Sequence, residues 1–183
     1  FSNMGLFRAF NKYKNNIAII DKEHSDLSYK QVLKESNKIK KKIKIKSLIL
    51  IISENTLGSL LAYIFCIINN HVAIIIDSKT DKKNILKVFK NYEPNYIFLS
   101  KEIKTIFNKK CLEKYSFFDQ ILLKNKINKK KKLNKNLSVL LSTSGSMGSI
   151  KFVKLSRNNL KINTDSIINY LKINNKDSAI TNL

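Results

Sequence analysis

Apolar runs alternate with amphipathic segments through the first hundred residues of the chain. Two of these runs, residues 47–53 and 72–77, are nearly continuous and rich in β-branched side chains. This pattern is typical of strands that are buried on both faces of a parallel sheet. Two shorter apolar runs, residues 16–21 and 95–99, also predict strands.

Three helices are predicted between these strands. The first begins at about Tyr29 with Ser28 as its N-cap, and its apolar residues follow helical spacing. The second is the apolar segment near residues 55–69, and the third covers about 81–91 with Asp81 as its cap. A β-α-β-α-β order with short links predicts an α/β fold, in which helices cover both faces of a mostly parallel sheet.

The second half of the chain has a less regular pattern. A weaker apolar stretch at residues 117–123 leads into residues 124–136, which hold seven lysines and no acidic residue. We interpret this lysine-rich segment as a solvated loop rather than a binding site. Strands are then predicted at residues 137–141 and 152–155, followed by a helix capped by Ser156. The apolar face of that helix consists of Leu160, Thr164, Ile167, Ile168 and Leu171.

The sequence predicts no transmembrane or targeting segment. The longest apolar run covers residues 57–68, which is shorter than the roughly 20 residues that a transmembrane helix needs. No signal peptide is visible, and residues 1–3 before Met4 are interpreted as a cloning remnant.

The cysteines and histidines do not indicate a metal site. Cys66 and Cys111 are far apart and lack the spacing of zinc ligands. Two unclustered cysteines favour a reducing, cytoplasmic location. His24 and His71 are also isolated from acidic and thiol residues, so catalytic roles for them are not favoured.

The residues between the two late strands, 142–151, have the composition of a phosphate-binding loop. Two of the four glycines of the chain, Gly145 and Gly148, lie there among five hydroxyl residues, and Lys151 follows. Glycines allow close approach of the backbone, successive N–H groups can cradle phosphate oxygens, and a lysine can offset the charge of a departing pyrophosphate. The alternative is a flexible Ser/Gly turn. The glycine and lysine spacing does not fit the Walker A sequence, which disfavours an ordinary P-loop NTPase.

This loop resembles the phosphate loop of the adenylate-forming superfamily, whose pattern is Thr-Ser-Gly-Ser/Thr-Thr-Gly-x-Pro-Lys-Gly-Val and then Leu-Ser-His-x-Asn-Leu. Residues 143–153 read TSGSMGSIKFV, and the sequence LSRNNL follows at 155–160. Two upstream segments match more weakly and in the same order, residues 27–29 and 68–77. The resemblance covers nearly the whole chain from about residue 14.

The resemblance implies an AMP-forming acid–thiol ligase of the acyl-CoA synthetase or amino-acid adenylating type. Such an enzyme uses ATP and Mg²⁺ to convert a fatty or amino acid into an acyl-adenylate. It then passes the acyl group to CoA or to the phosphopantetheine of an acyl carrier protein. The residues implied to hold the ATP phosphates are Thr143, Ser144, Gly145, Ser146, Gly148 and Lys151, with Lys151 also catalytic; no metal ligand is assigned.

The resemblance also implies that residues 4–183 form the N-terminal portion of a larger adenylation domain. Such enzymes are usually about three times longer than this chain. The adenine-binding Tyr-Gly-x-Thr-Glu segment of the family, its ribose-binding aspartate and its late lysine have no counterpart here. We therefore expect this chain to be an N-terminal fragment, without activity by itself.

Several positions depart from the family pattern. Met147 replaces a threonine, Ile150 replaces a proline, and Arg157 stands where histidine is common. His71 and Ile75 replace a glycine and a proline in the upstream segment. Met147 and Ile150 support an alternative interpretation, in which the chain is a non-catalytic relative that serves as a binding module.

The formal net charge of +22 suggests a second alternative, a basic nucleic-acid-binding domain. Only 2 of the 35 basic residues are arginines, although arginine is the residue that reads phosphates and bases in a bidentate manner. Lys, Ile and Asn have A/T-rich codons, and their joint excess fits a biased genome. We therefore predict no specific nucleic-acid partner, while a basic surface would also suit an acidic carrier protein.

Overall fold

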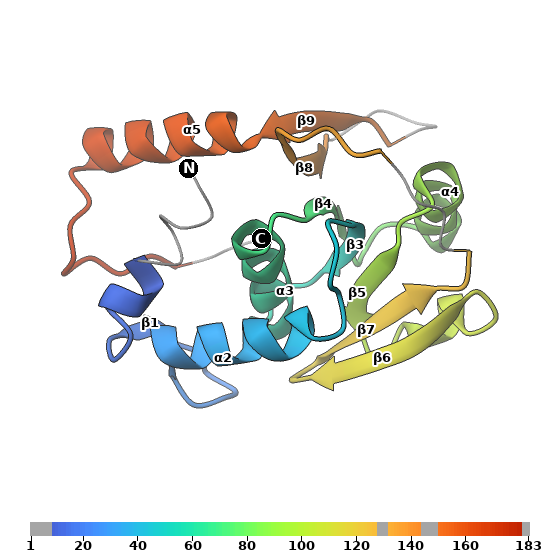
Figure 1. Cartoon of the computed structure of the whole chain (residues 1–183), viewed down its shortest axis with the longest axis horizontal. Coiled ribbons are helices and arrows are strands. Elements are labelled where there is room, and N and C mark those ends of the chain that lie inside the picture. Colours follow the sequence, from blue (N-terminus) through green and yellow to red (C-terminus); the bar gives the residue numbers. More distant parts are fainter. Residues whose placement is uncertain (1–8, 128–131, 144–149, 181–183) are drawn as a thin grey trace.

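A seven-stranded mixed sheet forms the centre of the fold, with four parallel strands in its middle (Figure 1). The computed structural model describes residues 9–127, 132–143 and 150–180, and its strand order is β6-β7-β5-β3-β4-β8-β9. The parallel strands are β5 (Tyr96–Ser100), β3 (Leu48–Ser53), β4 (Val72–Asp77) and β8 (Leu137–Ser142). Antiparallel strands complete both edges, namely β6 (Cys111–Phe117), β7 (Gln120–Asn125) and β9 (Phe152–Ser156). The predicted mostly parallel sheet is confirmed.

The central strand β3 explains why a continuous apolar run is needed there. Ile49 and Ile51 belong to one core cluster, and Leu50 and Ile52 belong to the other. Because successive side chains of a strand point to opposite faces, every position of β3 meets a covered face. All four of these side chains are at most 1% exposed.

Helices cover both faces of the sheet, as predicted. The helices α2 (Tyr29–Lys40) and α3 (Leu57–Ile68) contribute to one core cluster. The helix α4 (Lys82–Tyr92) and the short η1 (Lys104–Phe107) contribute to the other. Figure 1 shows α2 and α3 on one side of the strands and α4 on the other. None of the helices in the described residues is long and apolar enough to cross a membrane.

The predicted helix starts at Ser28 and Asp81 are confirmed. The Ser28 hydroxyl accepts the N–H of Gln31, whose side chain in turn accepts the N–H of Ser28. The Asp81 carboxylate accepts the N–H of Lys83. The predicted strand at residues 16–21 is confirmed as β1 (Ile17–Ile19). It pairs in a small separate sheet with β2 (Leu27–Ser28), which the sequence did not indicate.

The weak apolar stretch at 117–123 is part of an antiparallel hairpin, β6–β7, which the sequence analysis missed. The chain turns at Phe118, whose φ is 47°. Strand β6 has exposed polar residues such as Glu113 and Lys114, so its apolar signal is weak. The lysine-rich segment consequently starts later than predicted, because Lys124 and Asn125 belong to β7. Residues 128–131 of that segment lie outside the described residues.

The turn of this hairpin docks on the first turn of α3. One Asp119 oxygen accepts the N–H of Gly58 at 3.0 Å, and the other accepts the hydroxyl of Thr56 at 2.7 Å. A Cβ at position 58 would lie 2.5 Å from both the Asp119 carboxylate and the Gln120 side chain. A glycine is therefore required at position 58 by the close approach of the hairpin.

The last helix, α5 (Arg157–Leu171), begins as predicted but packs differently from the others. Ser156 and Asn159 form a reciprocal capping box at its start. None of its residues is buried, and Ile167 and Leu171 of its apolar face are 45% and 60% exposed. Figure 1 shows α5 extending beyond the sheet from the end of β9.

Candidate phosphate-binding site

The described ends of the predicted phosphate loop, residues 142–143 and 150–151, lie at the carboxyl ends of the parallel strands. The loop follows β8, which pairs in parallel with β4, and it returns to the sheet through β9. In open α/β sheets, ligands usually bind beyond the carboxyl ends of the strands. The tertiary structure therefore puts the predicted loop at the edge of the sheet where a ligand is expected.

The base of the loop is closed by backbone pairing. Ser142 is the partner of Phe152 in the β8–β9 ladder, which ends at that pair. One step further, the N–H of Thr143 donates to the carbonyl oxygen of Lys151 at 3.0 Å. The Thr143 hydroxyl also donates to that carbonyl oxygen, at 3.4 Å. The structure thus brings together Thr143 and Lys151, two of the predicted phosphate-binding residues.

The other predicted phosphate-binding residues cannot be compared with the structure. Ser144, Gly145, Ser146 and Gly148 lie outside the described residues, and so does Met147. Both described members of the set, Thr143 and Lys151, are exposed. An exposed lysine is accessible, as a residue that meets an anionic ligand must be.

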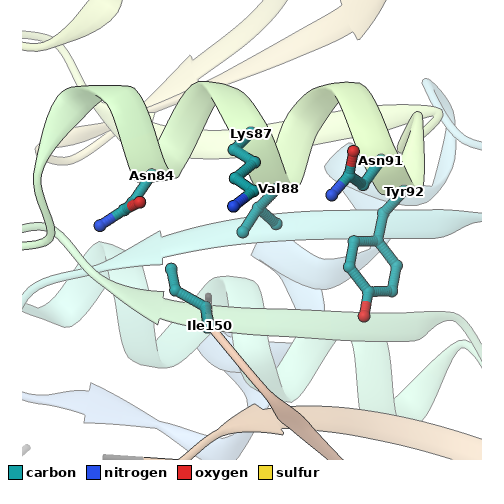
Figure 2. Close-up of a pocket in the computed structure, with 6 residues that line it drawn as sticks. All are labelled: Asn84, Lys87, Val88, Asn91, Tyr92 and Ile150. Atoms are coloured by element: carbon teal, nitrogen blue, oxygen red, sulfur yellow. The ribbon is translucent and has the colours of Figure 1, made fainter. Parts of the chain in front are cut away.

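The helix α4 packs against the chain where it leaves the predicted loop, a contact that the sequence did not indicate. Ile150 and the α4 residues Asn84, Lys87, Val88, Asn91 and Tyr92 line one small cavity (Figure 2). The rings of Tyr92 and Phe152 make an edge contact, with centroids 5.2 Å apart. The only sequence signal for this contact is the pair of large apolar residues on either side of Lys151.

Asp77 is the last residue of β4, the strand that pairs with β8. It is exposed, and its carboxylate accepts the N–H of Lys79 at 2.8 Å. The described residues contain no group of three or more His, Cys, Asp and Glu side chains that could hold a metal ion.

The two histidines are far from the predicted loop in the sequence, and their contacts are with other parts of the chain. His71 precedes β4 at the opposite edge of the sheet and is 2% exposed. Its Nδ1 accepts the N–H of Ser47 at 3.2 Å, and its ring stacks on Phe65. Burial, together with nearby Lys46, lowers the pKa of His71 to about 4, so it is neutral at pH 7. His24 forms a 2.7 Å contact with Asp21 within one turn.

The cysteines are buried and form no disulfide. Both Cys66 and Cys111 have free thiols. Burial raises the pKa of the Cys66 thiol far above its ordinary value and raises the pKa of Cys111 to about 11. Neither thiol is therefore ionised at neutral pH, and neither has the lowered pKa of a nucleophilic cysteine.

A second lysine-rich segment, residues 38–46, meets the segment at 124–136 at the edge of the sheet that is opposite the loop. The Lys46 ammonium donates to the carbonyl oxygens of Asn134 and Lys135, each at 3.1 Å. Lys46 precedes β3, and Asn134 precedes β8, so both lie where parallel strands begin. Lys46 and Lys135 therefore lie away from the predicted phosphate loop.

Comparison of the sequence alone with known proteins finds no relative. No protein-family model matches the chain, and no curated protein matches its sequence. Solved structures, however, share its fold. The O-succinylbenzoate coenzyme A synthetase MenE from Bacillus subtilis, in complex with AMP, matches with a TM-score of 0.71 and 14% identity. The match covers 94% of this chain and 47% of the synthetase.

Two further structures agree with this match. MatB from Rhodopseudomonas palustris, without ligand, has a TM-score of 0.72 at 14% identity, and the match covers 94% of this chain and 38% of MatB. A fatty acyl-adenylate ligase from L. pneumophila, in complex with acyl adenylate and pyrophosphate, has a TM-score of 0.66 at 18% identity. That match covers 94% of this chain and 32% of the ligase. The chain therefore has the fold of part of an adenylate-forming enzyme and spans less than half the length of these proteins.

Proposed function

We propose that this chain forms the ATP-phosphate-binding part of an adenylate-forming ligase. One observation carries the proposal: the loop whose residues resemble the family pattern lies at the carboxyl edge of a sheet that has the adenylate-forming fold. The loop motif concerns a few residues and the fold match concerns the arrangement of the whole chain, so the proposal has local as well as global support.

In this proposal the loop holds the β- and γ-phosphates of ATP. The backbone N–H groups of Gly145 and Gly148 and the hydroxyls of Thr143, Ser144 and Ser146 donate hydrogen bonds to phosphate oxygens. Lys151 offsets negative charge that develops on the leaving pyrophosphate when a carboxylate attacks the α-phosphate. The loop would hold Mg²⁺ together with the β- and γ-phosphates, and the ion would supply positive charge to neutralise the phosphate oxygens.

The rest of the proposed reaction involves groups beyond this loop. The acid is a small carboxylate, either a fatty acid or an amino acid, and the acyl group passes from AMP to a thiol. The thiol belongs to CoA or to the phosphopantetheine of a carrier protein. The names of the matching structures support this range, because they include a CoA synthetase and a fatty acyl-adenylate ligase. Because the chain spans less than half of those proteins, we propose that it does not catalyse the reaction by itself.

Carboxylate-dependent exchange of labelled pyrophosphate into ATP tests the proposal. The assay uses the natural protein that carries this sequence, with a panel of fatty and amino acids, and the 183-residue chain in parallel. We expect exchange in the natural protein with at least one acid, and none with the chain alone. The absence of both Mg-ATP binding and exchange in the natural protein would overturn the proposal.

Lys151 and Lys154 provide a matched pair of variants for this assay. Both lysines are exposed, and Lys154 lies in β9 only three residues beyond Lys151. We expect Lys151→Gln to lower the exchange rate by about 10²–10³-fold, the usual effect of removing one preorganised group that stabilises developing charge. Lys154→Gln should leave the rate within about twofold. Equal effects of the two substitutions would argue that only general positive charge matters.

A non-catalytic binding module is a second candidate, favoured by Met147 and Ile150 at two positions of the loop pattern. Such a module would bind Mg-ATP, or a carboxylate, without exchanging pyrophosphate. A thermal-shift titration with Mg-ATP and with each acid separates the two functions when it is combined with the exchange assay.

A further inference from the structure

Two large apolar residues flank Lys151 where the family pattern has a proline and a glycine. Ile150 stands at the proline position and Phe152 at the glycine position. A proline would fix φ at position 150, and a glycine at 152 would carry no side chain. The chain has therefore lost one conformational restraint beside Lys151 and has gained two side chains that can pack.

Both of these side chains pack against α4. Figure 2 shows the Ile150 side chain directed toward the helix beneath Val88, and the two residues line a cavity of about 30 Å³. Two positions further along the strand, the Phe152 ring meets the Tyr92 ring edge-on at an interplanar angle of 72°. Ile150, Phe152 and Tyr92 are partly buried against the core cluster that contains Val88.

The packing leaves Lys151 exposed between two anchored neighbours. Lys151 separates Ile150 from Phe152, and its own carbonyl oxygen accepts the Thr143 N–H at 3.0 Å. The backbone of Lys151 is thus held from three directions, by both neighbours and by the opposite side of the loop. A segment that is already ordered loses less conformational freedom when it binds a ligand.

We propose that these contacts form a clamp that positions the phosphate loop. The α4 clamp consists of Ile150 and Phe152 on the loop side, and Val88 and Tyr92 on the helix side. The packing of these side chains restrains the backbone beside Lys151, as the fixed φ of a proline would. The clamp thereby determines the position of the Lys151 ammonium group. The proposal rests on the proposed function for the identity of the ligand, but the clamp itself can be measured without any ligand.

Amide hydrogen exchange at Thr143 tests the clamp in the protein without nucleotide. The Thr143 N–H is protected by the Lys151 carbonyl oxygen, so its exchange rate reports whether the loop base is closed. We expect Ile150→Ala to speed this exchange by about tenfold, and Val88→Ala, which changes only the helix side, to do the same. Because the two side chains line the same cavity, the double variant should show less than the product of the two single effects.

Val153→Ala is the matched control on the same strand. Val153 follows Phe152, is 46% exposed and takes no part in the core cluster that contains Val88. Exchange at Thr143 should stay within about twofold in this variant. Exchange at core amides of β3 is followed at the same time, so that general destabilisation of the fold is separated from opening of the loop. An unchanged Thr143 rate in both clamp variants would overturn the clamp.

Mg-ATP binding to the same variants shows whether the clamp serves the phosphate loop. We expect Ile150→Ala and Val88→Ala to weaken Mg-ATP binding by about three- to tenfold, and to raise the KM for ATP more than they lower kcat in the exchange assay. Ile150→Pro should restore part of the affinity that Ile150→Ala loses. If exchange at Thr143 becomes faster while the affinity for Mg-ATP is unchanged, the contacts only stabilise the core. That result would overturn the proposed positioning role.

The closing comparison separates this proposal from the proposed function. If the unsubstituted protein binds no Mg-ATP, the proposed function fails and the positioning role fails with it, whatever the amide exchange shows. If the unsubstituted protein binds Mg-ATP while Ile150→Ala and Val88→Ala bind it equally well, only the clamp fails.

Discussion

The two edges of the parallel strands use polar side chains in opposite ways. At the edge where the strands begin, polar side chains are buried and satisfy backbone groups: Asn95 accepts the N–H of Leu48 at 2.9 Å, and His71 accepts the N–H of Ser47. At the edge where the strands end, Thr143 and Lys151 are exposed. The first edge uses polar side chains to pair buried backbone groups, and the second leaves these two polar side chains exposed.

The difference teaches where to look for function in this chain. A buried polar group that is already paired contributes to folding and has nothing left to offer a ligand. Exposed hydroxyl and ammonium groups near a glycine-containing loop contribute little to folding and remain accessible. Substitutions at the first edge should therefore change stability, and substitutions at the second edge should change ligand binding.

The largest expected effect is the pH dependence that His71 confers on stability. Its pKa is about 4 in the folded protein and 6.5 as the ordinary value, so the unfolded chain binds the proton more readily. The free energy of unfolding should be highest above about pH 6.5 and fall by up to ~3 kcal/mol as the pH drops toward 4. Urea unfolding at several pH values between 4 and 7 measures this slope.

His71→Gln is the control for that measurement, because it removes the titrating ring. The free energy of unfolding of this variant should fall less steeply between pH 6.5 and 4 than that of the unsubstituted protein. Equal slopes in the two proteins would show that His71 does not carry the pH dependence.

The second expected effect is a change of stability at the edge where the parallel strands end, so it tests whether that edge is free of structural roles. Gly58→Ala places a Cβ 2.5 Å from the Asp119 carboxylate and from Gln120, so the hairpin must shift. We expect a loss of about 2 kcal/mol in the free energy of unfolding. Asp119→Asn, which keeps the space and removes the charge, should cost less. A neutral Gly58→Ala would show that the hairpin turn yields without cost.

The third expected effect is the loss of a backbone partner at the stable edge. Asn95→Ala leaves the buried N–H of Leu48 without the amide oxygen that it meets at 2.9 Å, which should cost about 1–2 kcal/mol. Asn158→Ala is the control, since Asn158 is exposed in α5. Urea midpoints of the two variants measure the difference, and a midpoint for Asn95→Ala equal to that of the control would contradict the role of Asn95.

The smallest expected effect on stability is that of Lys151→Gln. Without nucleotide, its free energy of unfolding should change by less than about 0.5 kcal/mol, because the side chain is exposed. A saturating concentration of Mg-ATP, about 100 times Kd, should stabilise the unsubstituted protein by about 2.7 kcal/mol. The variant should show a much smaller shift in Tm. A large loss of stability without nucleotide would place Lys151 with the structural residues instead.

Local signals in the sequence predicted the regular elements well. The caps at Ser28, Asp81 and Ser156 each depend on a side chain and a backbone N–H two or three residues away, so the information is entirely local. The apolar runs that became β3 and β4 also predicted strands buried on both faces. The sequence did not indicate the hairpin β6–β7 because its outer strand, β6, has polar, exposed residues. The hairpin is held in the sheet by the pairing of its inner strand, β7, with β5.

The candidate site was predicted only in part. The sequence identified the loop and its position between two strands, and the structure brings Thr143 and Lys151 together at the loop base. The sequence did not indicate that α4 supports Ile150 and Phe152, because that contact joins residues about sixty positions apart. It also did not indicate that the lysines near 46 and 135 share one edge of the sheet.

The sequence by itself determined the periodicity of the elements, the caps of the helices and the residues that resemble a phosphate loop. These features depend on side-chain type and on spacing of a few residues, which the chain carries whatever its tertiary structure. Only the tertiary structure decided that the loop lies at the carboxyl edge while the lysine-rich segments meet at the other. That arrangement depends on the strand order β5-β3-β4-β8, in which burial of both sheet faces brings together strands that are far apart in sequence.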